Sequence, residues 1–212
     1  MGAFDGFWSF EMERRGAAEV VAIDVDDPEE LDFAIDYKAA GPEHIREIRA
    51  ERGPGFAEAK AALGSSAVRR NRSVYDLDPI EDGRFDVVVC GAILLHLRDP
   101  VLALERIREV CDGTLVLVEL VDPILELFAP RYPSAAVRPY ADQWWVTNSP
   151  GMEKMLSMGG WDVVQRCPRF LFPYGPSGPS RPDQSWLTGI AARRPGRRGI
   201  LGRIWLARPR PK

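Results

Sequence analysis

Continuous apolar runs alternate with amphipathic stretches along most of the chain, and this alternation limits the possible folds more than any other feature. The runs "AEVVAID", "FDVVVC" and "GTLVLVEL" contain β-branched residues and are typical of strands covered on both faces. Among them, "PGFAEAKAALGS", "PVLALERIREVC" and "GMEKMLSMGG" have helical spacing beside a proline. Two late segments, "WDVVQRC" and "WLTGIAAR", suit an antiparallel pair at one edge. We therefore predict an α/β fold with a mostly parallel sheet, helices on both faces and an antiparallel edge strand.

The charges divide the chain into two parts. The formal net charge is −3, although residues 193–212 carry eight basic residues and no acid, so residues 1–192 have a formal charge of −11. We expect one globular domain over residues 1–192 and a basic C-terminal tail over residues 193–212. The tail is either a solvated end, which we favour because Gly and Pro interrupt it, or an anchor for RNA or an anionic membrane. The anchor would use an apolar face made of Ile200, Leu201, Ile204, Trp205 and Leu206.

Several further observations exclude other classes of protein. The longest uncharged run, residues 87–97, is too short to cross a bilayer, and no secretory signal opens the sequence, so we expect a cytoplasmic protein. Cys90, Cys111 and Cys167 are odd in number and widely spaced, which argues against a disulfide framework and a zinc site. Asp24, Asp26 and Asp27 lack the spacing of a calcium loop, so we expect no metal.

Four features fall at the carboxyl ends of successive predicted strands, where an open parallel sheet binds its ligands. They are the turn between Gly2 and Gly6, Asp24 after "AEVVAI", Asp76 in the expected strand "RSVYDLDP", and the Cys90-Gly91 exit of "FDVVVC". Glycines let the backbone approach a ligand carboxylate near a helix start. Asp24 could accept both hydroxyls of a ribose, and Asp76 could accept from an adenine amino group, with Leu77 against the ring. These groups together suit adenosine with an amino-acid tail, which is S-adenosylmethionine.

The segments that carry these features resemble class I, Rossmann-like S-adenosylmethionine-dependent methyltransferases, and most closely a bacterial branch related to enzymes that modify tRNA wobble uridine. They include "GAFDGFWSFEMERRGAAEVVAID", "GRFDVVVCGAILLHLRDPVLALERIREV" and "WWVTNSPGMEKMLSMGGWDVV". The resemblance implies a seven-stranded sheet of order 3-2-1-4-5-7-6. It also implies one site per cofactor part: Gly2 and Gly6 at the methionine portion, Asp24 at the ribose, Asp76 and Leu77 at the adenine, and Cys90 and Gly91 near the sulfonium. Asp5 either caps the loop or reaches the cofactor's ammonium.

The start of the sequence departs from the family pattern. In the family an apolar strand that ends in Asp or Glu precedes the glycine loop and lies in the middle of the sheet, and here Met1 occupies its last position. Each backbone group that lost its partner in a buried sheet would cost roughly 1–3 kcal/mol. We therefore expect that the start has been placed too late and that the first strand is truncated.

Several side chains have both a functional and a structural interpretation. His96 could be a general base for a hydroxyl or amine acceptor, or it could pack beneath the following helix. Trp144 and Trp145 could form an acceptor-pocket wall or attract the cationic sulfonium through a ring face, although aromatic pairs are more often core or loop-anchoring residues. Of Phe7 and Trp8, we expect one in the core and the other against the cofactor.

The sequence predicts an enzyme that transfers a methyl group from S-adenosylmethionine to a small molecule by direct displacement, with His96 as the base. The acceptor favoured is small because the acidic domain would repel a phosphate backbone. The alternatives are a tRNA-modifying methyltransferase, which the basic tail would serve, and a catalytically inactive truncated binding protein.

Overall fold

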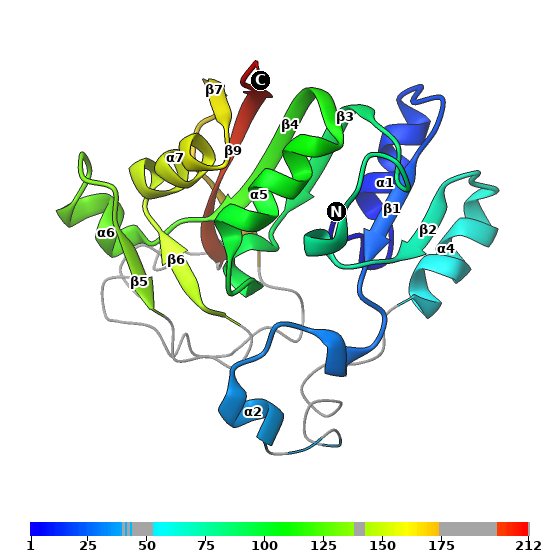
Figure 1. Cartoon of the computed structure of the whole chain (residues 1–212), viewed down its shortest axis with the longest axis horizontal. Coiled ribbons are helices and arrows are strands. Elements are labelled where there is room, and N and C mark those ends of the chain that lie inside the picture. Colours follow the sequence, from blue (N-terminus) through cyan, green and yellow to red (C-terminus); the bar gives the residue numbers. More distant parts are fainter. Residues whose placement is uncertain (40, 42, 44–52, 138–142, 174–198, 212) are drawn as a thin grey trace.

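A computed structural model describes residues 1–39, 41, 43, 53–137, 143–173 and 199–211, and it shows strands with helices packed around them (Figure 1). A five-stranded sheet has the order β3 (Phe85–Gly91), β4 (Cys111–Leu120), β9 (Gly199–Pro209) and β7 (Trp161–Arg166), and β8 (Phe170–Pro173) also pairs with β9. β3 and β4 are parallel, and β9 is antiparallel to β4, β7 and β8. β1 (Val21–Asp24) and β2 (Val68–Asn71) make a separate parallel pair. This mixed arrangement confirms the predicted α/β class.

The helices lie on both faces of the strands, as expected. Successive residues of β1 face opposite sides: Ile23 joins the core cluster of the large sheet, whereas Ala22 joins a second cluster around Phe56. The first side holds α5 (Pro100–Glu109) and α7 (Ser149–Met158), which contact each other. The second side holds α1 (Phe7–Arg14) and α4 (Pro54–Leu63), which meet where the tilted rings of Phe10 and Phe56 lie with their centroids 5.0 Å apart.

Helix α5 shows how local sequence sets these elements. The Asp99 carboxylate accepts a hydrogen bond of 2.9 Å from the Leu102 amide, and Pro100 occupies the first turn. One face of the helix then buries Leu104 and Ile107 completely. The helix ends at Glu109, so Cys111 belongs to β4 rather than to the helical face that its spacing suggests.

The prediction of a strand in "RSVYDLDP" is wrong. β2 ends at Asn71, and Val74–Asp76 form a single 3-10 turn, η2. The Ser73 hydroxyl accepts from the Tyr75 amide at 3.3 Å, and this local hydrogen bond competes with pairing to a neighbouring strand. Asp76 therefore lies beyond the end of the strand, on a turn.

The prediction of a solvated C-terminal tail is also wrong, at least for residues 199–209. Residues 199–209 form β9 between β4 and β7, with Trp205 and Ala207 fully buried, so this part of the basic segment is an inner strand. Its alternating pattern was hidden by the arginines. Just after the strand, Arg210 Nε donates to Asp162 Oδ1 at 2.6 Å. The expected strand "WLTGIAAR" and the boundary at residue 192 lie outside the described residues.

The remaining elements surround this framework. Within the described ranges, no helix is long and apolar enough to cross a membrane. The other elements are η1 (Pro28–Glu30), α2 (Ile35–Ala39), η3 (Leu94–His96), α6 (Pro123–Phe128), β5 (Ala135–Val137) and β6 (Trp145–Thr147).

Candidate functional site

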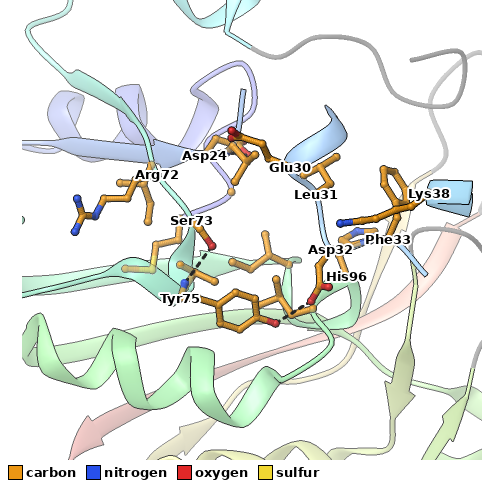
Figure 2. A pocket seen from close by; sticks show the side chains of 17 residues that line it. Asp24, Glu30, Leu31, Asp32, Phe33, Lys38, Arg72, Ser73, Tyr75 and His96 are labelled. Atoms are coloured by element: carbon orange, nitrogen blue, oxygen red, sulfur yellow. Dashed lines mark hydrogen bonds between the residues drawn. The ribbon is translucent and has the colours of Figure 1, made fainter. Parts of the chain in front are cut away.

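A cavity of about 260 Å³ lies at the carboxyl ends of β1, β2 and β3 (Figure 2). Parallel strands bring their loops to this edge, so distant parts of the sequence share one wall. The lining residues come from the start of the chain, the end of β1, the segment after η1, the loop after β2 and the turn η3. They are Met1, Gly2, Ile23, Asp24, Val25, Glu30, Leu31, Asp32, Phe33, Lys38, Arg72, Ser73, Val74, Tyr75, Ile93, His96 and Leu97.

Asp24 ends β1 inside this cavity and is only 6% exposed. Its Oδ2 accepts a hydrogen bond of 2.7 Å from the Phe4 amide, and its Oδ1 accepts one of 2.9 Å from the Val25 amide. These two amides fix the orientation of the Asp24 carboxylate at the end of β1.

Gly2 brings the first loop close to the exit of β3. Its φ is +68°, and a Cβ at this position would lie 2.4 Å from Ile93 Cγ2 and 3.3 Å from the Gly91 carbonyl oxygen. Any larger residue would have to push these two loops apart, so glycine is required by both conformation and space.

Asp32 fixes the segment that covers one side of the cavity. Its Oδ2 accepts from the Tyr75 hydroxyl at 3.0 Å and from the Arg98 amide at 2.6 Å, while its carbonyl accepts from Trp144 Nε1 at 2.7 Å. The Tyr75 oxygen in turn accepts from the Asp99 amide at 3.0 Å. Burial raises the pKa of Tyr75, so its hydroxyl stays protonated and keeps donating to Asp32. Figure 2 shows this contact at the floor of the cavity.

His96 reaches the cavity from η3, and its turn is anchored from below by a buried acid. Glu119 on β4 is 1% exposed, and its Oε1 accepts from the Leu94 amide at 2.8 Å. Burial raises the pKa of Glu119 to about 7, although hydrogen bonds from the backbone of Leu94 and Ile93 oppose the shift. In Figure 2, His96 and Lys38 lie at the end of the cavity opposite Arg72.

Six of the eight predicted cofactor residues are not among the described residues that line the cavity. Cys90 is fully buried, and a Cβ on Gly91 would lie 2.7 Å from Val118 Cβ, so both serve sheet packing. Gly6 has φ of +90° and lies against the Phe10 ring, which lets α1 pack. Leu77 belongs to the core cluster. Asp5 lies against Gly55 at the start of α4, and Asp76 follows the cavity wall by one residue.

The structure therefore brings together Gly2, Asp24 and His96 from the predicted set and adds residues that the sequence did not indicate. Glu30, Asp32 and Lys38 come from a segment without clear periodicity, and Ser73–Tyr75 replace Asp76–Leu77 because β2 ends earlier than expected. The Ser73 turn signal, a hydroxyl two residues before Tyr75, could have located that wall.

The aromatic candidates also have defined places. Phe7 and Trp8 are 69% and 47% exposed, so neither is a core residue, and the expectation that one of them would be is wrong. Trp144 and Trp145 anchor loops: their Nε1 groups donate to the carbonyls of Asp32 and Leu97. Arg98 also lies over the Trp144 ring at 5.0 Å.

The described strands form separate sheets rather than the single sheet of order 3-2-1-4-5-7-6 that the resemblance implies. Comparisons with known proteins nevertheless show a Rossmann-like α/β methyltransferase fold. The N-terminal domain of EvdMO1 with S-adenosylhomocysteine and D-fucose superposes with a TM-score of 0.57 at 14% identity, over 99% of this chain and 74% of that one. A Methanosarcina mazei S-adenosylmethionine-dependent methyltransferase gives 0.57 at 16%, over 100% and 91%. Burkholderia thailandensis 1,6-didemethyltoxoflavin-N1-methyltransferase, with that substrate and S-adenosylhomocysteine bound, gives 0.52 at 15%, over 96% and 76%.

The chain belongs to the methyltransferase-domain family, which matches residues 1–117, more than half of its length. It is an S-adenosylmethionine-dependent methyltransferase domain. No curated protein sequence matches it.

Proposed function

We propose that this protein transfers a methyl group from S-adenosylmethionine to a small-molecule acceptor, with Asp24 holding the cofactor and His96 acting as general base. The observation that supports this most is the cavity itself, which joins Gly2, Asp24 and His96 from three separate loops at one sheet edge. The tRNA branch suggested by the resemblance is the finer alternative.

The residues of the cavity fit a cationic nucleoside. Its lining includes the acids Asp24, Glu30 and Asp32 and the bases Lys38 and Arg72. Arg72 is already paired with Glu81 and Asp82, so the acids outweigh the bases and favour a ligand with a positive sulfonium and ammonium. Asp24 suits the ribose hydroxyls, and the apolar side chain of Val74 between Ser73 and Tyr75 suits one face of an adenine ring. Gly2 and Ile93 would then border the methionine portion. The cofactor supplies an electrophilic methyl group, and the chain's own residues bind and orient it.

His96 is the residue we assign to deprotonation of the acceptor. It lines the cavity from η3, and its ring nitrogens are the kind of base that titrates near neutral pH. Lys38 shares that end of the cavity, where a cation would favour the deprotonated acceptor. Correct placement of such a base contributes typically about 10²–10⁴-fold to a rate.

A small acceptor is favoured over tRNA by the charge of the chain and by β9. The formal net charge is −3, and residues 199–209 of the basic segment form the inner strand β9. Just after that strand, Arg210 is bound by Asp162. This part of the segment is therefore built into the sheet rather than presented as a free arm. The Burkholderia enzyme, of the same fold, acts on a small heterocycle.

Two measurements test the proposal. Calorimetry with S-adenosylmethionine and S-adenosylhomocysteine should show binding that Asp24→Ala abolishes, and absence of binding would favour the inactive binding protein instead. Methyl-labelled S-adenosylmethionine should then label the small-molecule fraction of a cell extract and not purified tRNA. Labelling of tRNA alone would overturn the acceptor class. His96→Ala should bind cofactor normally and lose turnover, whereas full turnover would remove the role of base.

A further inference from the structure

Glu119 is an acid at a position of β4 where the sheet otherwise carries apolar side chains. It is 1% exposed, and the residues before and after it on the same face of the strand, Leu117 and Val121, are buried as well. A buried carboxyl group costs free energy unless it is hydrogen-bonded, and an apolar side chain in its place would avoid that cost. The groups that Glu119 binds therefore show what the acid is for.

The Glu119 carboxylate binds the backbone at the start of the turn η3. Its Oε1 accepts from the Leu94 amide at 2.8 Å, and the backbone of Ile93 also hydrogen-bonds to it. The Ile93 carbonyl belongs to the same planar peptide unit as the Leu94 amide, and it accepts from the His96 amide at 2.9 Å. The Leu94 carbonyl in turn accepts from the Leu97 amide at 3.2 Å. The orientation of the 93–94 peptide unit, set from Glu119, therefore also sets the backbone of His96.

The turn held in this way forms part of the wall of the 260 Å³ cavity. Ile93, His96 and Leu97 line that cavity. Ile93 also limits the first loop, since a Cβ on Gly2 would lie 2.4 Å from its Cγ2. Glu119 is not among the described residues that line the cavity, so it acts on the site through the backbone and not by touching a ligand.

Few charges lie near the Glu119 carboxyl group. It borders a space of about 10 Å³, room for at most one water molecule, and it is the one ionisable residue among the described residues that line this space. Helices α5 and α7 reach the space through uncharged side chains, which are Pro100, Met152 and Met155.

The ionisable groups on the neighbouring strands are Cys90 on β3 and Arg203 on β9, which lies opposite Glu119. Burial raises the pKa of Cys90 to about 12, so the thiol stays neutral. Arg203 has charged neighbours of its own, which are Glu126, Glu153, Arg166 and Arg169. His96, at the far end of η3, is the remaining ionisable group of the turn.

We propose that Glu119 is a positioning residue of the methyl-transfer site: its carboxyl group orients the 93–94 peptide unit and thereby places Ile93 and His96 in the cavity. The part that concerns His96 as a base rests on the proposed function, whereas the placement of the turn does not. A hydrogen bond to an ionised acceptor is shorter and stronger than one to a neutral acceptor. The turn should therefore respond to the proton on Glu119, which an inert packing residue would not cause.

Loss of that proton should tighten the turn. Burial raises the pKa of Glu119 to about 7, so above this pH the Leu94 amide is held by a charged acceptor and below it by a neutral one. The desolvation cost of the charge lowers the stability of the whole fold, whereas the tightening is confined to the backbone that the carboxylate binds. Local and global stability should therefore change in opposite directions as the pH rises.

The test follows the amides of Ile93 and Leu94 by NMR in the protein without cofactor. In the unaltered chain both amide proton resonances should titrate with a midpoint near pH 7, and Leu94 exchange, corrected for the intrinsic effect of pH, should be slower above the midpoint than below it. Glu119→Gln keeps an acceptor oxygen and loses the charge, so the Leu94 amide should stay protected and the titration should vanish. Glu119→Leu removes the acceptor and should speed Leu94 exchange roughly tenfold or more.

Asp122→Asn is the matched control. Asp122 follows β4 directly and is 5% exposed, and its carboxylate accepts from the amides of Ile124 and Leu125. This variant should leave residues 93–97 unchanged. A titration that persists in Glu119→Gln overturns the proposal, as does Leu94 exchange in Glu119→Leu equal to that of the unaltered protein. If Glu119→Leu does not fold, the loss or persistence of the titration in Glu119→Gln decides alone.

Calorimetry with S-adenosylhomocysteine on the same proteins separates this inference from the proposed function. Glu119→Leu should weaken binding roughly tenfold because Ile93 and His96 leave their places, whereas Glu119→Gln should bind nearly as the unaltered protein does. The amide titration in a protein that binds neither S-adenosylhomocysteine nor S-adenosylmethionine would confirm the role of Glu119 in the turn and refute the proposed cofactor. Unchanged affinity in Glu119→Leu, together with fast Leu94 exchange, would overturn the effect of the turn on the site.

Discussion

The Phe4 amide donates to Oδ2 of Asp24, and this bond of 2.7 Å makes the glycine loop and the end of β1 a single unit. Among the residues that the structure describes, Phe4 is the one non-glycine residue with a positive φ, which is 46°. Such a conformation is disfavoured for a large side chain, so the loop depends on an outside contact to hold it. Asp24, which we propose binds the ribose, supplies that contact.

Asp24→Asn should weaken both the loop and the site. An amide presents one acceptor oxygen instead of two, so either Phe4 or Val25 loses a partner, at a cost of roughly 1–3 kcal/mol in unfolding free energy. Denaturant unfolding and calorimetry measure the two effects. Asp112→Asn, at an acid that is exposed and pairs with Arg84, is the matched control and should change neither. Unchanged cofactor affinity in Asp24→Asn would contradict the ribose assignment.

Gly2→Ala should cost more than Gly64→Ala, although both residues have positive φ near 65°. The backbone penalty is similar, about 1–2 kcal/mol for a left-handed conformation. At Gly64 an added Cβ meets nothing within 4 Å, whereas at Gly2 it meets Ile93 Cγ2 at 2.4 Å. The difference in thermal stability between the two variants measures the cost of the steric clash at Gly2. Adding Ile93→Ala to Gly2→Ala should recover part of the cofactor affinity, and no recovery would show that the clash is absent.

Stability should depend on pH through Glu119. Burial raises its pKa to about 7 in the folded protein, against an ordinary value of about 4.3, so between these values the folded state keeps a proton that the unfolded chain has lost. Unfolding free energy should therefore fall as pH rises through this window, by up to about 3 kcal/mol, and level off above about pH 8. Glu119→Gln should flatten this slope in denaturant titrations between pH 4.5 and 8. An identical slope in the variant would assign the effect elsewhere.

Tyr75→Phe should loosen the segment that Asp32 holds over the cavity. The variant removes a donor to Asp32 and the acceptor for the Asp99 amide, and it leaves the ring volume in place. We expect faster hydrogen exchange in residues 28–33 and cofactor binding weaker by roughly tenfold, equivalent to about 1.4 kcal/mol. Tyr132→Phe, at a residue 74% exposed, serves as control. If the two variants behave alike, the Asp32 contact does not support the site.

The sequence was sufficient to predict the elements that are specified by residues close together in the chain. The runs at β3 and β4 and the Asp99-Pro100 start of α5 were located correctly, because apolar pattern and capping act within a few residues. The end of β1 at Asp24 was also correct.

The features that the sequence did not predict depend on contacts between distant residues. Asp32 enters the site through Tyr75 and Arg98, 43 and 66 residues away, and no periodicity marks such partners. Asp76 was placed in the site because the end of β2 was misjudged by a few residues, which changes every side chain assigned to the rim. β9 was missed because its arginines outweighed its alternation, and only the sheet shows that Trp205 is buried.

The place of β9 also dictates when the protein can acquire its structure. Among the strands that the structure describes, β7 reaches β4 only through β9, so the larger sheet has no continuous hydrogen bonding until residues 199–209 are available. During synthesis β9 leaves the ribosome after β4 and β7, so the edge of β4 that β9 covers stays open to other strands until then.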